Sequence, residues 1–430
     1  MKRRFMVMVA LVATACTLLY WPKASPRATG VLPNAVYIWQ RAWNTGLEQS
    51  IAEHAADFAE LLALNAEVSW RHNQPRVARV ALDYPALLRS GRSVGLALRI
   101  GPYPGPFRPN DEQVRRLGDL AASLLNEAAA NQLRVAELQI DFDCAESKLD
   151  GYRVWVETVR RRAAPVPVTI TALPAWLKRP AFRRLLDSAD GYVLQVHSLA
   201  RPRDASAPFS LCDPLEARRA VERAGRLGKP FRVALPTYGY VVAFDSRGRF
   251  TGLSAEGPER LWPEGTQLRE VRAEPEAMAK LVAGWRIDRP QALTGVIWYR
   301  LPLAGDTLNW SWRTLAAVME GQIPCTDLRV DARRPQPGLV EIDLVNAGQA
   351  DHVLPVRVGF NWSKARLVAA DGLQGFEWAD RGAGEIQFTH SQGSPRLEAG
   401  QRLTIGWVRL DREAEVQVQI QERSNPVFLK

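Results

Sequence analysis

The 430-residue chain lacks the short motifs that identify several common classes of enzyme. It contains no G-x-S-x-G, no Walker A sequence and no H-E-x-x-H, and its five histidines show no metal-ligand spacing. No glycine-rich loop follows the first strand-like run, as a dinucleotide-binding sheet would require. We therefore do not expect a serine hydrolase, a P-loop protein or a metalloprotease, and we expect no metal and no cofactor.

Cysteine is scarce: the chain has four, and their wide spacing does not suit a zinc cluster. Cys144 directly follows a predicted strand, and Cys212 lies in a predicted loop at the same end of the fold. A Cys144–Cys212 disulfide that braces this end is one interpretation, and buried free thiols are the other.

Charge and hydrophobicity exclude two further classes. The formal net charge is +10, yet the arginines are spread over predicted helices with acidic residues close by. Because no basic block is interleaved with aromatic residues, we expect no nucleic-acid partner. Only one stretch could reach across a membrane, which excludes a multi-spanning transporter.

That stretch begins the chain. Residues 2–4 are Lys-Arg-Arg, and an apolar run follows over residues 5–21, which is typical of an export signal or a membrane anchor. Residues 13–16 also resemble a lipobox, in which Cys16 would be lipidated. Lipoprotein, anchor and cleaved signal stay open. Each predicts an exported body, periplasmic or membrane-anchored in the cell envelope, with the membrane as a partner through residues 1–30.

From residue 31 to residue 322, short apolar runs alternate with helix-period segments. The strand candidates are residues 35–41, 64–69, 94–100, 134–142, 166–172, 191–197, 231–237 and 294–300. The helical segments are residues 45–62, 111–130, 148–162, 179–188, 213–227, 273–286 and 307–320. Eight strands alternating with helices over ~290 residues predict an α/β fold, a (β/α)8 TIM-type barrel. A doubly wound open sheet is the alternative.

After residue 322 the pattern changes. Between residues 323 and 430 hydrophobic residues alternate at period two, and no long helix is indicated. The predicted strands are residues 326–330, 338–345, 354–360, 385–389, 402–408 and 414–421. We expect a small all-β sandwich that serves as an accessory domain. The chain thus divides into residues 1–30, 31–322 and 323–430.

The fourth predicted barrel strand has one apolar face and one polar face. Residues two apart in a strand share a face, and the polar face carries Glu137, Gln139, Asp141 and Asp143. Because the apolar face must pack against the helices, these four side chains point into the barrel. Asp141 and Asp143 come last, at the carboxyl end, where barrel active sites lie. A structural ion-pair network is the alternative interpretation of this polar column.

Neighbouring strands bring polar and aromatic side chains to the same end of the barrel by the same alternation. Arg99 lies beside the fourth strand, where it would hold Asp141 ionised, and His197 shares the expected mouth. The candidate substrate-binding residues are Trp39, Arg41, Arg99, Gln139, Gln195, His197, Tyr238 and Trp298. The two tryptophans of this set would stack on sugar rings.

Four runs of the chain resemble a known bacterial family. YIWQRAW, LQIDFDCAESKLDGY, TITALPAWL and GVIWYRLP look like segments of the domain of unknown function 3142 family, which would cover most of residues 33–320. At a more distant level, the order of the parts is similar to glycoside hydrolase family 18, the chitinase-like barrels.

The distant resemblance implies a sugar site on the fourth and eighth strands. Chitinase-like barrels carry D-x-x-D-x-D-x-E on the fourth strand, ending in the catalytic acid, and a tryptophan that floors the sugar site on the eighth. The matching positions here are Ala136, Gln139, Asp141 and Asp143, and Trp298 matches the tryptophan. Only Asp141 is identical among the four, and Asp143 is one methylene shorter than the family's glutamate.

Three hypotheses on function stay open. The first is an exported carbohydrate-active enzyme, a glycoside hydrolase, with Asp143 as the general acid, its pKa raised by its neighbour, and Asp141 as the charge stabiliser. The second is a non-catalytic glycan-binding barrel. The third is a structural cell-envelope protein whose sandwich docks a partner. In the first two, the partner is a carbohydrate polymer.

Overall fold

The computed structural model describes residues 25–71, 74–103, 105–109, 111–197, 204–207, 210–254, 262–354, 357–390 and 396–421. The expected export segment, with its candidate lipidation site Cys16, lies outside these residues. Of the helices in these ranges, none has both the length and the hydrophobicity needed to span a bilayer.

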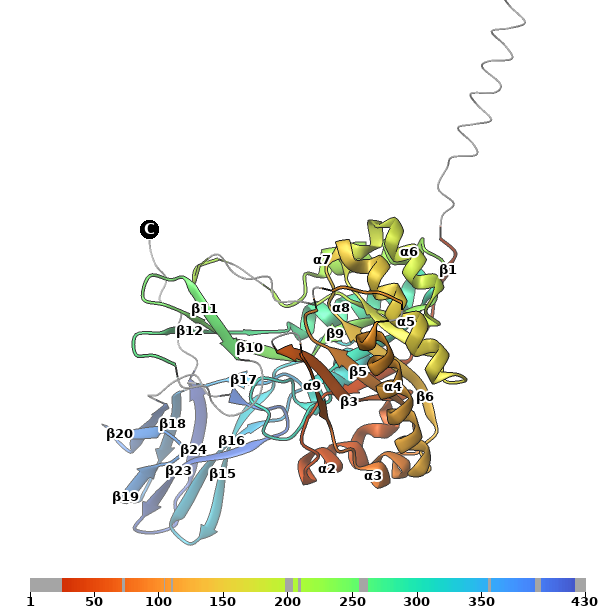
Figure 1. Ribbon diagram of the computed structural model, residues 1–430. Helices are drawn as coiled ribbons and strands as arrows, with labels where there is room; N and C mark the ends of the chain where they lie inside the picture. The colour runs from red at the N-terminus through yellow and green to blue at the C-terminus, as the bar shows by residue number, and fades with distance from the viewer. Residues whose placement is uncertain are drawn as a thin grey trace, which may run out of the picture.

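Eight parallel strands close into a barrel, which confirms the predicted fold class (Figure 1). The strands follow one another in the order β2-β14-β9-β8-β7-β6-β5-β3, and β2 pairs with β3 to complete the ring. They are β2 (Asn34–Ile38), β3 (Glu60–Arg71), β5 (Ser93–Ile100), β6 (Val135–Phe142), β7 (Val168–Ala172), β8 (Gly191–Gln195), β9 (Phe231–Pro236) and β14 (Leu293–Tyr299). Each overlaps its predicted run, because a strand that is buried on both sides is a nearly continuous apolar segment.

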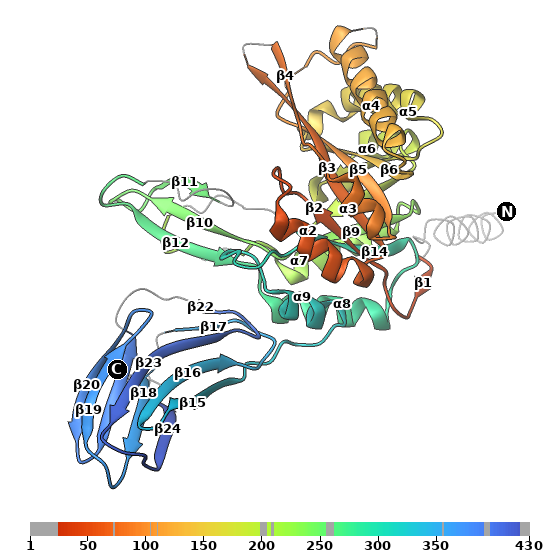
Figure 2. The ribbon, with the colours of Figure 1, turned by 90° about the horizontal axis from the view of Figure 1, so that it is seen from below.

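Helices alternate with these strands and cover the outside of the barrel (Figures 1 and 2). They are α2 (Thr45–His54), α3 (Tyr84–Arg89), α4 (Glu112–Ala130), α5 (Leu149–Ala163), α6 (Pro180–Asp187), α7 (Pro214–Gly225), α8 (Pro275–Ile287) and α9 (Trp312–Met319). Short 3-10 turns are η1 (Ala55–Asp57), η2 (Glu146–Lys148) and η3 (Pro174–Lys178). Asp213 begins α7 by accepting two backbone N–H groups of its first turn, at 2.8 and 3.1 Å.

The helix predicted over residues 45–62 is too long. Helix α2 ends at His54, and β3 begins at Glu60. The apolar residues that follow Glu60 are completely buried in the barrel core as part of β3. A short apolar run fits a buried strand and a buried helix equally well, so periodicity could not place this boundary.

Three additions to the barrel were not predicted. Strand β4 (Gln74–Arg79) forms an antiparallel hairpin with the second half of β3. An antiparallel sheet of β10 (Gly239–Phe244), β11 (Phe250–Ser254) and β12 (Gln267–Arg272) follows β9 and projects away from the barrel (Figure 2). A two-stranded pair joins β1 (Arg27–Ala28) to β13 (Arg289–Pro290).

The C-terminal part is a sandwich of two antiparallel sheets (Figure 2). One sheet contains β15 (Leu328–Gln336), β16 (Leu339–Asn346), β23 (Arg402–Leu410) and β19 (Leu367–Gly372). The other contains β20 (Phe376–Gly382), β21 (Glu385–His390), β18 (Arg357–Trp362) and β24 (Val416–Gln421), and a separate pair is formed by β17 (His352–Val353) and β22 (Arg396–Leu397). Buried residues of both sheets form one core, including Ile342, Phe360 and Phe388.

The sandwich contacts the barrel part through a hydrogen bond and an ion pair, among other contacts. Thr314 of α9 donates a hydrogen bond from Oγ1 to the backbone oxygen of Gln349, at 2.6 Å. Arg396 of β22 lies 3.4 Å from a carboxylate oxygen of Glu270 on β12. The sandwich therefore meets both the helical layer of the barrel and the projecting sheet.

Candidate active site at the barrel mouth

The polar column of β6 has different partners at different levels of the barrel. At the amino end, Glu137 forms an ion pair with Arg232 of β9, which also pairs with Glu60 of β3. The three side chains are at most 17% exposed. Burial, together with the Glu137 charge, raises the pKa of Glu60 to about 7. At this level the structural interpretation is correct, because the arginine offsets the charge of buried carboxylates.

Gln139 lies one step higher and supports an aromatic side chain. It is 0% exposed, and its Oε1 accepts a hydrogen bond from the Tyr37 hydroxyl at 2.6 Å. Tyr37 lines the cavity at the barrel mouth, whereas Gln139 does not. The prediction that Gln139 contacts substrate is therefore wrong, because its side chain is enclosed beneath the cavity.

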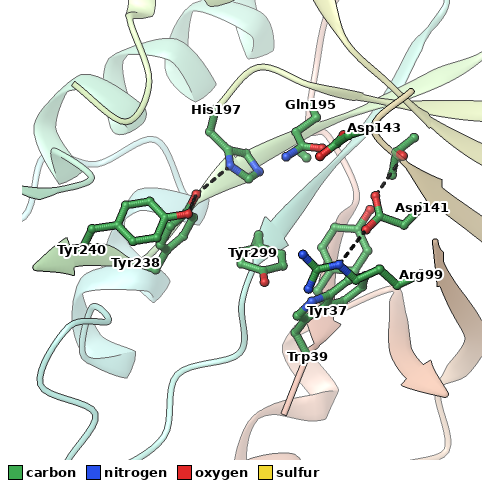
Figure 3. A pocket seen from close by; sticks show the side chains of 12 residues that line it. Tyr37, Trp39, Arg99, Asp141, Asp143, Gln195, His197, Tyr238, Tyr240 and Tyr299 are labelled. Atoms are coloured by element: carbon green, nitrogen blue, oxygen red, sulfur yellow. Dashed lines mark hydrogen bonds and ion pairs between the residues drawn. The ribbon is translucent and has the colours of Figure 1, made fainter. Parts of the chain in front are cut away.

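A cavity of about 170 Å³ lies at the carboxyl ends of the strands (Figure 3). Most of its walls are polar or aromatic: the lining residues are Tyr37, Trp39, Arg99, Asp141, Asp143, Thr171, Gln195, His197, Ala234, Tyr238, Tyr240 and Tyr299. The cavity brings together most of the predicted site residues. Those that do not line it are Arg41, Gln139 and Trp298.

Asp141 is held on two sides. Its Oδ1 accepts a hydrogen bond from Thr171 Oγ1 at 2.9 Å, and the same Oγ1 accepts the Phe142 backbone N–H at 3.2 Å. Arg99, its register partner on β5, places Nε 4.0 Å from Oδ2. Burial and the charge of Asp143 raise the pKa of Asp141 to about 6, although Arg99 and Thr171 act in the opposite direction.

This result differs from the expectation that Arg99 holds Asp141 ionised. Arg99 does not outweigh burial, so Asp141 keeps a proton up to a higher pH than an ordinary aspartate. Asp143 lies at the exposed rim of the mouth. Partial burial raises its pKa, against the effect of Arg99, and repulsion from its neighbour is not the cause. Asp141 is therefore the better proton donor of the pair at mildly acidic pH.

Arg99 is shared with a third carboxylate. Its Nη1 lies 3.3 Å from Oε1 of Glu67, its register partner on β3. Arg41 donates to both oxygens of Glu67, at 2.6 and 2.9 Å. Burial would raise the pKa of Glu67, but the two arginines outweigh it and lower that pKa. Arg41 therefore acts on the mouth through Glu67. It was predicted to contact substrate, but it does not line the cavity.

His197 lines the cavity just after β8, which lies two strands from β6 in the ring (Figure 3). Its Nδ1 lies 3.2 Å from the Tyr238 hydroxyl, and the Tyr240 hydroxyl donates to that of Tyr238 at 3.4 Å. Burial lowers the pKa of His197 to about 3, so the ring is neutral at neutral pH. Tyr240 belongs to the projecting sheet, and the sequence patterns that locate barrel strands did not identify it.

Aromatic rings form a continuous wall of the cavity. Trp39 contacts Tyr37 and Tyr299 edge-to-face, with ring centroids 5.2 and 5.5 Å apart, and Tyr238 lies 5.2 Å from Tyr299. Trp298 was predicted to stack on sugar, and this is wrong. It is 0% exposed, and because the next residue, Tyr299, lines the cavity, Trp298 lies on the other face of β14. Tyr299, one residue later, occupies the mouth.

The position of Trp298 has a local cause. Its Nε1 donates to Asn34 Oδ1 at 2.9 Å, and its ring packs near Trp310, at 6.2 Å between centroids. Residues on both faces of β14 are buried and apolar, so alternation in the sequence did not reveal which face points inward.

The cysteines near the mouth are free thiols. Cys144 and Cys212 are buried and not bonded to each other, and Cys325 is an exposed free thiol. Of the two interpretations of Cys144 and Cys212, the structure therefore has the buried free thiols and not the disulfide. Burial raises the pKa of both buried thiols to about 12, which makes them poor nucleophiles.

The fold and the mouth together define a closed (β/α)8 barrel with an aspartate pair in an aromatic-walled cavity. Residues 107–304 match the family model described as Domain of unknown function (DUF3142), and residues 329–411 match Domain of unknown function (DUF8456). The first match contains both aspartates and confirms the predicted resemblance, although the run YIWQRAW lies outside it. No curated protein matches the chain in sequence.

Several solved structures are similar to this chain. The spore cortex-lytic enzyme SleL of Bacillus cereus has a TM-score of 0.49 at 11% identity, covering 69% of this chain and 75% of that one. A chitinase from Chromobacterium violaceum has a TM-score of 0.44 at 14% identity, covering 68% and 98%. A GH18 chitinase from Flavobacterium johnsoniae has a TM-score of 0.44 at 11% identity, covering 68% and 94%.

Proposed function

We propose that the chain is an exported glycoside hydrolase that cleaves a glycosidic bond of a carbohydrate polymer at its barrel mouth. The observation that carries this proposal is the aspartate pair of β6, in which Asp141 has a pKa of about 6 beside the exposed Asp143. Hydrolysis of this kind needs one carboxyl group that is protonated and one that is ionised. Aromatic walls suit the apolar faces of sugar rings.

The hydrogen bonds around Asp141 indicate which oxygen would deliver the proton. Thr171 has a single hydroxyl hydrogen and, while its oxygen accepts the Phe142 N–H, directs that hydrogen to Asp141 Oδ1. The proton of the neutral acid is then carried on Oδ2. Asp141 would protonate the leaving oxygen from Oδ2 as the bond to the sugar carbon breaks, and ionised Asp143 would stabilise the positive charge that develops on the sugar. A water molecule would then add to that carbon and return a proton to Asp141.

The size of the cavity limits what it encloses. Its volume of about 170 Å³ lies below the roughly 300–1,000 Å³ of pockets that enclose drug-sized ligands. The mouth would therefore hold one sugar unit, and the rest of the polymer would lie outside it. The two aspartates are two residues apart on one strand, about 6–7 Å between Cα atoms, a spacing that fits both retaining and inverting chemistry.

The test is release of reducing sugar by the purified full chain from carboxymethyl-cellulose, glycol chitin, soluble peptidoglycan and alginate. Asp141→Asn and Asp143→Asn are compared with Asp119→Asn, which makes the same change on the exposed face of α4. We expect release from at least one polymer, a loss of about 100-fold or more in each mouth variant, and no loss in the control.

Two other outcomes would replace the proposal. Binding of a polymer without release, unchanged in both mouth variants, would indicate a non-catalytic glycan-binding barrel. Neither binding nor release would favour a structural cell-envelope protein. The small cavity and its dense aromatic wall favour the glycan-binding alternative over the structural one.

Location is part of the same proposal. The basic residues 2–4 and the apolar run 5–21 support export, with the membrane as a partner through this segment. Cell fractionation of the full chain, compared with a chain that lacks residues 5–21, tests it. We expect the full chain in the periplasmic or membrane fraction and the truncated chain in the cytoplasm. Equal distribution of the two would overturn export.

A further inference from the structure

His197 presents one ring nitrogen to the protein and the other to the cavity. The residue is 3% exposed and lines the mouth, and Nδ1 lies 3.2 Å from the Tyr238 hydroxyl. Figure 3 shows the second ring nitrogen turned away from Tyr238. Within the described part of the chain, no group forms a hydrogen bond with Nε2.

The hydroxyl groups of Tyr238 and Tyr240 determine which nitrogen of the His197 ring carries the hydrogen. Tyr240 donates to the Tyr238 oxygen at 3.4 Å, so the Tyr238 hydrogen points elsewhere. Burial raises the pKa of Tyr238 well above its ordinary value, so that hydrogen is retained. His197 Nδ1 is the acceptor within reach. A neutral imidazole that accepts at Nδ1 donates at Nε2.

We propose that His197 is a neutral hydrogen-bond donor whose Nε2–H binds an uncharged acceptor oxygen, hydroxyl or carbonyl, of the sugar unit in the mouth. Tyr238 and Tyr240 are positioning residues that hold this tautomer. The inference rests on the proposed function, which makes the ligand a sugar unit. A sugar unit carries hydroxyl and carbonyl oxygens of this kind. It adds a specificity-determining group to the cavity that the aspartates line.

The surroundings of His197 agree with a neutral donor. The rings that face it are Tyr238, Tyr299 and, behind Tyr238, Tyr240, and the charged groups of the cavity are the aspartate pair and Arg99. None of these charges contributes to the lowered pKa of His197, which burial explains alone. The ring therefore binds without adding a second positive charge to the mouth.

The first test reads the tautomer directly and does not depend on activity. The full chain is labelled with ¹⁵N-histidine, and the His197 signals are identified by their loss in His197→Gln. We expect an unprotonated Nδ1, a protonated Nε2 and no titration between pH 5 and pH 8. Tyr238→Phe should disturb this pattern, and Tyr84→Phe, which removes a hydroxyl on α3, should not. A protonated Nδ1, or titration within this range, would overturn the donor.

The second test measures affinity for whichever of the four polymers the wild type binds most tightly. We expect His197→Ala to weaken binding about fivefold to tenfold, the equivalent of one neutral hydrogen bond. His197→Gln, whose amide can still donate, should recover most of the loss.

The two proposals can fail separately. Unchanged binding in His197→Ala, with release still lost in Asp141→Asn, would overturn the donor and leave the hydrolase in place. Weakened binding in His197→Ala, with release unaffected in Asp141→Asn, would support the donor and overturn the catalytic role of the pair.

Discussion

Replacing Asp141 with asparagine should stabilise the folded protein at pH 8 and hardly change its stability at pH 4. The pKa of Asp141 rises from 3.8 to about 6 on folding. A raised carboxyl pKa means that the folded state binds the proton more tightly than the unfolded chain. Its stabilising effect is complete below pH 3.8 and is lost as the pH rises through about 6. At pH 8 the buried charge therefore costs about 3 kcal/mol, at about 1.36 kcal/mol for each pKa unit.

Asparagine removes this cost because it carries no charge, and its side-chain oxygen can still accept the Thr171 hydroxyl. We expect the variant to gain about 2–3 kcal/mol at pH 8 relative to pH 4, seen as a rise of several degrees in the melting temperature of the barrel. Differential scanning calorimetry at both pH values measures it, with Asp119→Asn as the exposed control. An equal effect of Asp141→Asn at the two pH values, or a loss of stability at pH 8, would refute the reasoning.

Three further predictions concern charge and packing at other levels of the barrel. Asp143→Asn should lower the pKa of Asp141 by about one unit, because it removes a screened negative charge whose Cα lies about 6–7 Å away. Carbon-13 titration of the Asp141 carboxyl group measures this pKa, and an unchanged value would contradict the repulsion between the two aspartates. Arg232→Met should destabilise the barrel by about 3–5 kcal/mol in thermal unfolding at pH 7, because it leaves buried carboxylates unpaired. Trp298→Ala should lower the free energy of unfolding by about 3–5 kcal/mol without weakening glycan binding. Tyr299→Ala should weaken glycan binding about tenfold and leave the melting temperature unchanged. The reverse pattern would show that Trp298, and not Tyr299, contacts the sugar.

The sequence predicted the barrel well because its strands are buried on both faces. Such runs are apolar and short, so their positions can be read even where their orientation cannot. The projecting sheet was missed for the opposite reason. Strand β12 has the sequence QLREVR, of which only Val271 is buried, so no hydrophobic pattern distinguishes it from a loop. The mouth residue Tyr240 lies on β10, whose apolar sequence GYVVAF was not assigned to a strand.

Side-chain direction could be predicted only where a strand mixes polar and apolar residues. On β6 the alternation placed Asp141 and Asp143 in the mouth, and both line the cavity. On β14 both faces are apolar, and the wrong aromatic residue was assigned to the sugar site.

The protonation of the pair could not be predicted from neighbours on adjacent strands, because it depends on the whole set of charges. The sequence correctly placed Arg99 beside Asp141. It did not indicate that Glu67 also competes for Arg99. Among the described residues at the mouth and their direct ion-pair partners, three carboxylates share two guanidinium groups, those of Arg99 and Arg41. One of the three negative charges therefore has no guanidinium to offset it. Protonation of a carboxylate is most favourable where that carboxylate is most deeply buried. Burial, together with the charge of Asp143, therefore leaves the proton on Asp141, and Arg99, which Glu67 shares, does not offset these two effects.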